Sequence, residues 1–124
     1  MNVALWIAAG VLALAYAAAG LMKITGKREQ MLERMPWVND FTQGQVTTIG
    51  VVEVLGALGL ILPAVTGIAP ILVPIAATGL AVTSVLAAVM HLRRGDGFAS
   101  TIPVFVLFAL AVFVAWGRFG PYAF

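Results

Sequence analysis

The sequence predicts an all-α integral membrane protein, a bundle of four transmembrane helices with a short interfacial helix between the first two. The first observation is composition, because 62% of the 124 residues are hydrophobic and only 10% are charged. A soluble domain of this size needs far more polar side chains to cover its surface. The second observation is a mean hydropathy of +1.06. The third is the arrangement of the apolar runs, which places spans at about residues 3–23, 46–63, 70–92 and 101–117 of a single domain, residues 1–124.

The first apolar run, from Val3 to Met22, is long enough to cross the hydrocarbon core. About 20 helical residues at ~1.5 Å each span roughly 30 Å. A signal peptide is the alternative, and the triplet Ala17-Ala18-Ala19 fits its cleavage site. However, no basic residue precedes the run, and the apolar region of a signal peptide is only about 7–15 residues long. We therefore expect a retained helix.

The polar connection after this helix predicts a short helix on the membrane surface. Met31, Leu32 and Met35 recur at helical spacing among charged residues, as they do in interfacial amphipathic helices. Pro36 should end this helix. The sequence TQGQ at residues 42–45 then fits a capping box at the start of the second span.

Prolines mark further helix ends. Pro63 should close the second span. Pro70 and Pro74 should lie in the first turns of the third span, where a missing N–H group costs least. The connection between these two spans is short and uncharged, so their helices should pack antiparallel. The fourth span should end just before Arg118.

The distribution of basic residues predicts which way the bundle faces. One side of the membrane should carry six Lys and Arg residues, and the other only Arg118 and the terminal amine. Basic residues collect on the cytoplasmic side of membrane proteins. The two charged connections should therefore face the cytoplasm, and both termini should face outward. The six residues are Lys23, Lys27, Arg28, Arg34, Arg93 and Arg94.

The residue inventory excludes several kinds of site. The chain has no cysteine, which excludes disulfides, thiol redox chemistry, thiolate-bound zinc and iron–sulfur clusters. His91 is its one histidine, so bis-histidine haem ligation is excluded within one chain. The net charge of +2 rests on few charged residues, and we expect no nucleic-acid partner. The sequence contains no nucleophile–base pair, metal set or dinucleotide-binding loop, so we expect no intrinsic cofactor and no catalysis by the chain alone.

Glu53 is a lone carboxylate in the apolar run IGVVEVLGALGLIL, residues 49–62. A charged acid at the centre of a membrane helix costs roughly 2.5–3.5 kcal/mol on insertion scales, and such residues usually face protein or water. Counted from Val46, Glu53 lies about 10 Å below the cytoplasmic edge. A structural ion pair or a role in binding a ligand or proton would account for it, and the two can coexist.

Two polar layers are predicted when the polar residues of the other spans are compared with Glu53 by their depth in the membrane. Lys23 and His91 mark the cytoplasmic ends of the first and third spans. Two helical turns deeper lie Tyr16 and Ser84, on the same helix faces. Structural alternatives are a snorkelling anchor for Lys23, a basic rim for His91, and a core or lipid-facing position for Tyr16. For Ser84 and Thr83, the alternative is a hydrogen bond to the backbone of their own helix. The candidate ligand-binding residues are Glu53, Lys23, His91, Tyr16, Ser84 and Thr83.

Four segments carry a family pattern: AGLMKITGK (19–27), MPWVNDFT (35–42), IGVVEVLGALGLILP (49–63) and HLRRGD (91–96). With the four-span layout, which covers nearly the whole chain, they resemble the DoxX-like family of small bacterial membrane proteins. By this resemblance, Lys23, Glu53 and His91 occupy the recurrent polar positions of the family. The resemblance implies a multi-pass protein of the bacterial cytoplasmic (inner) membrane.

The resemblance also implies a functional context. Better-studied relatives are described as membrane subunits of redox assemblies, among them a thiosulfate:quinone oxidoreductase and an oxidative-stress complex with superoxide dismutase and a sulfurtransferase. One hypothesis is therefore an accessory subunit with a cytoplasm-facing pocket around Glu53. That pocket would bind a quinone, a lipid or another small apolar ligand, in a redox assembly with a cytoplasmic partner protein.

Two other hypotheses stay open. The main alternative is a structural membrane scaffold with an internal Glu53–Lys23 ion pair. A proton or ion conductor is the third, although a single inner polar layer gives no continuous relay across the membrane. The sequence leaves homo-oligomerisation open as well.

Overall fold

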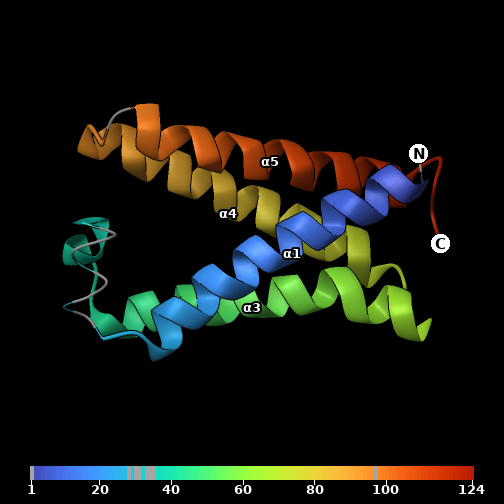
Figure 1. Ribbon diagram of the computed structural model, residues 1–124, viewed down its shortest axis with the longest axis horizontal. Helices are drawn as coiled ribbons and strands as arrows, with labels where there is room; N and C mark the ends of the chain where they lie inside the picture. Colours follow the sequence, from blue (N-terminus) through green and yellow to red (C-terminus); the bar gives the residue numbers. More distant parts are fainter. Residues whose placement is uncertain (1, 28, 30–31, 33–35, 97) are drawn as a thin grey trace.

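The computed structural model describes residues 2–27, 29, 32, 36–96 and 98–124, and these form an all-α bundle without strands (Figure 1). Residues Thr101–Phe119 and three complete helices are each long and apolar enough to cross a membrane. The predicted four-helix membrane fold is therefore confirmed. The elements are α1 (Asn2–Thr25), η1 (Pro36–Asp40), α3 (Gln43–Thr66), α4 (Leu72–Arg94) and α5 (Phe98–Phe119).

The four long helices pack as two pairs. α1 lies against α3 and α4 lies against α5, while contacts of α3 with α4 and of α1 with α5 join the pairs. In Figure 1, α1 crosses the bundle diagonally. Its first residues lie near α5, and its last residues lie near the start of α3. The pairs approach each other at the end that holds both termini and diverge toward the end that holds η1 (Figure 1). The backbones of the two pairs are therefore farthest apart at the η1 end.

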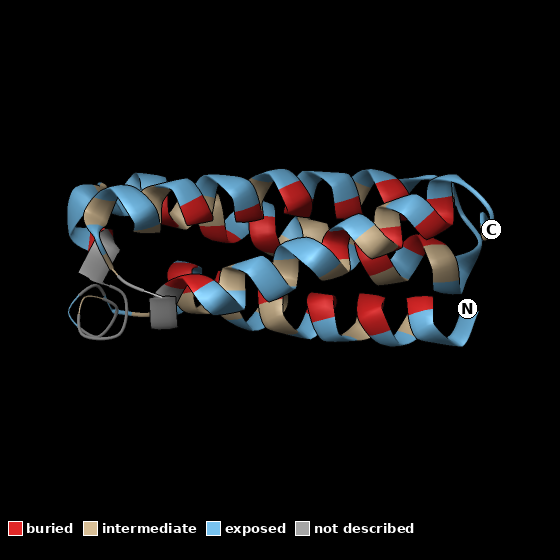
Figure 2. Ribbon diagram, turned by 90° about the horizontal axis from the view of Figure 1, so that it is seen from above, coloured by how far each residue is buried: buried red, intermediate tan, exposed pale blue. Residues whose placement is uncertain are grey.

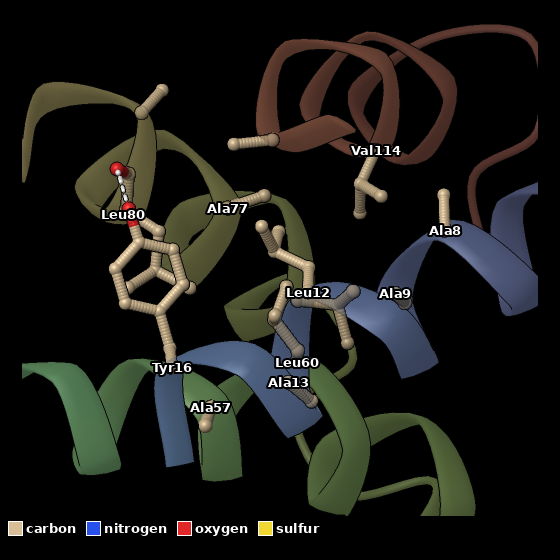
Figure 3. Packing of buried hydrophobic residues seen from close by; sticks show 13 residues of the cluster. Ala8, Ala9, Leu12, Ala13, Tyr16, Ala57, Leu60, Ala77, Leu80 and Val114 are labelled. Atoms are coloured by element: carbon tan, nitrogen blue, oxygen red, sulfur yellow. Dashed lines mark hydrogen bonds between the residues drawn. The ribbon is translucent and has the colours of Figure 1, made fainter. Parts of the chain in front are cut away.

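Leucine and alanine side chains fill the centre of the bundle. Leu12, Leu60 and Leu80 are buried there among alanines of several helices (Figure 3). Gly56 lies directly against the Leu80 side chain, and Gly59 lies against Ala76 on the facing helix. Small residues allow membrane helices to approach closely. The outer faces of the helices are apolar and exposed (Figure 2), as a surface that contacts lipid should be.

The capping box predicted for the second span is present at the start of α3. Thr42 Oγ1 accepts a hydrogen bond from Gln45 N–H at 3.2 Å, and Gln45 Oε1 accepts one from Thr42 N–H at 2.9 Å. These two bonds satisfy donors that a helix N-terminus otherwise leaves without partners. The cap fixes where α3 begins and thus where its polar residue falls.

Pro63 does not end α3, contrary to the sequence-based prediction, because the helix continues to Thr66. A proline removes one N–H group from a helix, but the Pro63 carbonyl still accepts a hydrogen bond from Gly67 N–H at 3.0 Å. Gly67 then ends the helix in the left-handed conformation, with φ of 72°, which glycine adopts without steric cost. The residue that stops this helix is Gly67.

The remaining helix ends lie near the predicted ones. α4 begins at Leu72, so Pro74 lies in its first turn as expected. Pro70 belongs instead to the preceding turn, where its carbonyl accepts a hydrogen bond from Val73 N–H at 3.1 Å. α5 begins at Phe98, somewhat earlier than the predicted start.

The interfacial helix predicted after α1 falls mainly outside the described residues, because Met31 and Met35 are not among them. The element that follows is η1, which the sequence analysis did not predict. Val38 of η1 is fully buried and clusters with Val46 of α3, and Met90 of α4 packs against this cluster. η1 is thereby attached to both helix pairs at the end where they diverge.

Candidate functional site

The crossing of α1 and α3 positions two of the predicted polar residues. Gly20 and Gly50 lie so close that a Cβ atom on Gly20 would be 2.6 Å from the Gly50 carbonyl oxygen. A side chain at either position would force the two helices apart. Lys23 and Glu53 each follow one of these glycines by about one turn, so both lie on the contact face of their helix.

Lys23 and Glu53 form a buried ion pair between α1 and α3. Lys23 Nζ donates a hydrogen bond to Glu53 Oε1, and the two residues are only 7% and 4% exposed. The Lys23 side chain therefore extends into the bundle and not outward to the membrane surface. This ion pair is the one that the sequence analysis considered as the structural alternative.

The predicted depth difference between Lys23 and Glu53, two helical turns, is too large. A Cβ atom on Gly50 would lie 2.9 Å from Lys23 Cβ, so Lys23 begins opposite Gly50. Glu53 is three residues farther along, which is about 4.5 Å of helix. The prediction counted residues from the helix ends as if the axes were parallel, whereas α1 crosses the bundle diagonally (Figure 1).

Tyr16 and Ser84 link α1 to α4 through a hydrogen bond between their hydroxyl groups. Ser84 Oγ also donates to the Leu80 carbonyl oxygen at 2.9 Å, and Tyr16 OH lies 3.5 Å from that oxygen (Figure 3). These two residues therefore lie at the same depth, as the sequence predicts. Thr83 is different, because its hydroxyl donates to the Gly79 carbonyl of its own helix at 3.0 Å.

His91 belongs to a separate network at the end of α4. Its Nδ1 lies 2.8 Å from Asp96 Oδ2, which also accepts a hydrogen bond from Arg94 Nε at 3.2 Å. Arg94 donates in addition to Asp40 at the end of η1, and this contact links α4 to η1. The hydrogen bond with His91 holds the pKa of Asp96 below its ordinary value. The Arg94 charge acts in the same direction, while desolvation of the carboxyl opposes both.

A cavity of about 790 Å³ lies between the two helix pairs at the η1 end. Its volume is within the range of roughly 300–1,000 Å³ that is typical of ligand pockets. Ser84 is not part of its wall and lies behind Tyr16. The other five candidate residues line it: Tyr16, Lys23, Glu53, Thr83 and His91.

Most of the remaining wall is apolar, and sequence reasoning missed it. Phe41, Ile49, Met90, Val104 and Leu107 are examples, contributed by three helices and the η1 connection. In a chain this hydrophobic, an apolar residue that faces a cavity has no distinguishing pattern. Asp40 was missed as well, because its partner Arg94 lies far away in the sequence.

Glu53 presents one carboxylate oxygen to the cavity. Oε1 accepts the hydrogen bond from Lys23, and no described residue donates one to Oε2. Within the described residues, every fully buried side-chain nitrogen or oxygen atom has a partner. Oε2 must therefore keep some accessible surface, and the surface that Glu53 borders is the cavity. The same part of the chain contains no group of three or more His, Cys, Asp or Glu side chains that could hold a metal ion.

The opposite end of the bundle holds a second buried cation, Arg118, which is 4% exposed. Arg118 Nη1 donates hydrogen bonds to Asn2 Oδ1 at 2.7 Å and to the Tyr122 carbonyl oxygen at 2.9 Å. The guanidinium carbon lies 4.0 Å from the centroid of the Phe124 ring and 5.9 Å from that of Trp6. The burial of Arg118 was not predicted from the sequence, where it marked the end of the fourth span and the outward-facing side.

The chain matches the model of the DoxX-like family over residues 7–114, which is most of its length. It therefore belongs to the DoxX-like family, as the resemblance suggested. No curated protein and no solved structure matches it significantly. Family membership and the four apolar helices together identify a multi-pass membrane protein whose environment is the lipid bilayer.

Proposed function

We propose that this member of the DoxX-like family is a binding or accessory protein whose cavity around Glu53 holds a small apolar ligand with a polar group. A quinone and a lipid both meet that description. The observation that carries the proposal is the carboxylate of Glu53, which gives one oxygen to Lys23 and leaves the other beside the cavity. If the buried carboxylate served only to hold two helices together, we would expect both of its oxygens to accept hydrogen bonds from protein donors.

The composition of the wall supports an apolar ligand. Ile49, Met90 and Leu107 contribute hydrocarbon surface from three different helices. Ligand pockets commonly combine a mainly apolar wall with a few placed polar groups that fix orientation. In this pocket, Lys23 would hold the Glu53 carboxylate in place, and the free oxygen would hydrogen-bond to the polar group of the ligand.

A place in a membrane redox assembly is the broader part of the proposal. It rests on family membership and on the absence of cysteine from the sequence, which leaves electron transfer to a partner protein or a diffusible carrier. Four described basic residues lie at the η1 end and support an orientation with that end in the cytoplasm, where a soluble partner would reach it: Lys23, Lys27, Arg93 and Arg94. The bacterial inner membrane is the location that these features favour.

A structural scaffold is the second candidate, and the Lys23–Glu53 ion pair favours it. This pair ties α1 to α3 inside the bundle, and the hydrogen bond between Tyr16 and Ser84 ties α1 to α4. The two contacts alone would stabilise the bundle without any ligand. The candidates therefore differ in what Glu53 does beyond its contact with Lys23.

The variant Glu53→Gln separates the two candidates, because the amide keeps the shape of the side chain and removes its charge. Glu29→Gln is the matched control, since Glu29 is exposed and does not line the cavity. Thermal unfolding would be followed in detergent with and without an isoprenoid quinone or a phospholipid, together with mass spectrometry of molecules that copurify. A binding protein should show ligand-dependent stabilisation in the native chain and in Glu29→Gln, and should lose it in Glu53→Gln. A scaffold should show no ligand-dependent stabilisation in any form and a lower midpoint in Glu53→Gln.

A further inference from the structure

We infer that the ligand of this cavity is an amphiphile with an uncharged polar head and a hydrocarbon chain, which enters sideways from the bilayer between α3 and α4. The inference rests on the proposed function and adds to it the route of entry and the charge of the head. It would place the head beside Glu53 and leave the chain in contact with the surrounding lipid.

The wall of the cavity between α3 and α4 is open toward the membrane. Val52 on α3 is 49% exposed, and Leu86 and Val89 on α4 are 65% and 43% exposed, yet all three line the cavity. A residue that lines a cavity and is also exposed lies at an opening. Because these three are apolar and lie within spans that would cross the bilayer, the opening faces lipid and not water.

The arrangement of the helices explains why the opening lies there. α3 and α4 are in close contact toward the opposite end, where Gly56 meets Leu80 and Gly59 meets Ala76. From there the two helices diverge toward the η1 end (Figure 1). A gap between them at the level of Val52 and Leu86 is the consequence, and hydrocarbon is the material that would fill it.

The end of the cavity that would face the cytoplasm is partly closed. Asp40 at the end of η1 is bonded to Arg94 of α4, and Val38 packs with Val46 and Met90 just beneath. A ligand that arrived from water would have to separate these contacts. One that arrived from the bilayer would pass mainly the apolar side chains of Val52, Leu86 and Val89.

The charges around Glu53 favour an uncharged head. Lys23 and Glu53 form a hydrogen-bonded pair of opposite charges, and the pair as a whole is neutral. A charged head beside it would bring a further charge into a region of low dielectric constant, which is unfavourable. A hydroxyl or carbonyl head would instead hydrogen-bond to the free Glu53 oxygen or to Lys23 at little electrostatic cost. Monoacylglycerols and isoprenoid quinones share this chemistry.

Head-group charge is tested by comparing four probes with the protein in phosphatidylcholine nanodiscs. The probes are a monoacylglycerol, an isoprenoid quinone, a fatty acid well above the pKa of its carboxyl group, and a lysophosphatidylcholine. Native mass spectrometry gives the affinity of each, and the first two arms show which uncharged source the protein prefers. We expect at least one uncharged probe to bind about a hundredfold more tightly than the fatty acid, the ratio that insertion scales imply for one charge. Equal or tighter binding of the fatty acid would overturn the assigned head chemistry.

The route of entry is tested by narrowing the opening. Val52→Trp places a large ring in it, and Leu55→Trp is the control, because Leu55 is exposed on the same helix and does not line the cavity. Val89→Trp and Val85→Trp form a second such pair on α4, in case one variant folds poorly. The rate at which a fluorescent monoacylglycerol transfers from donor vesicles should fall by about tenfold or more in Val52→Trp and Val89→Trp, and should not change in the controls.

Failure of the proposed function and failure of the proposed entry route would give different results. If no probe binds the native chain, the proposed function itself is wrong. If a probe binds and the variants on the opening transfer it as fast as their controls, the ligand does not enter between α3 and α4, and only the present inference is overturned.

Discussion

Two buried cations, Lys23 and Arg118, lie at opposite ends of the bundle and are accommodated in different ways. Lys23 is paired with a carboxylate, and the pair borders a cavity. Arg118 has no acidic partner in the described part of the chain. Neutral oxygen atoms of Asn2 and Tyr122 accept its hydrogen bonds, and aromatic rings cover its guanidinium group. Similar burial is thus reached by charge compensation at one end and by cation–π contact and neutral acceptors at the other.

Under the proposed function, this difference separates an end that binds a ligand from an end that is structural. A carboxylate beside a cavity can accept a hydrogen bond from a ligand, so the η1 end suits a ligand that exchanges with the surroundings. The Arg118 end joins Asn2 of α1 to the segment after α5. The two ends should therefore respond differently when their cation is removed.

The largest effect should come from Lys23→Met. The replacement leaves Glu53 buried without its partner, and breaking a buried ion pair in this way typically costs about 3–5 kcal/mol. Reversible unfolding in detergent measures the loss. Lys27→Met is the control, because Lys27 is exposed. The double variant Lys23→Met/Glu53→Met should recover most of the stability, since no charge is then left behind. A single variant as stable as Lys27→Met would mean that the pair does not compensate a buried charge.

Gly50→Ala should have the next largest effect, because its Cβ atom would lie 2.7 Å from the Gly20 carbonyl oxygen. Inserting a methyl group into a tightly packed contact costs about 1–3 kcal/mol, and the displaced helices would also separate Lys23 from Glu53. Gly10→Ala is the matched control, because its added Cβ atom would meet nothing within 4 Å. Thermal unfolding should show a loss for the first variant and none for the second. Equal midpoints would show that the η1 end does not depend on this crossing.

Arg118→Met should have the smallest effect of the three, about 1–2 kcal/mol. It removes the contacts with the aromatic rings and two hydrogen bonds, but it strands no carboxylate. The same unfolding experiment measures it, and Arg118→Lys distinguishes the charge from the planar guanidinium group, which lysine lacks. If Arg118→Met proved as costly as Lys23→Met, the contrast between the two ends would not stand.

Local patterns in the sequence predicted the parts of the structure that depend on neighbours along the chain. The Thr42 capping box and the shared depth of Tyr16 and Ser84 were found in this way, because each follows from spacing within a helix. The burial of Glu53 followed from its isolation in an apolar run.

The parts that escaped prediction depend on contacts between distant segments. The direction of the Lys23 side chain is set by the angle at which α1 crosses α3, and no spacing in the sequence encodes that angle. The contact of Asp40 with Arg94 joins residues far apart in the sequence. The apolar wall of the cavity could not be distinguished from apolar surface that faces lipid, because both are made of the same residues.

The close contacts of Gly56 and Gly59 with α4 also have a mechanical consequence. They hold α3 against α4 at the narrow end of the bundle, so α3 could rotate about this contact. The stretch of α3 from Gly59 back to its start at Gln43 is about 24 Å long. A rotation of about 5° about the contact would move the start of α3 by about 2 Å. Very small changes in packing at two glycines would thus be enlarged into a change in the width of the cavity at the other end of the molecule.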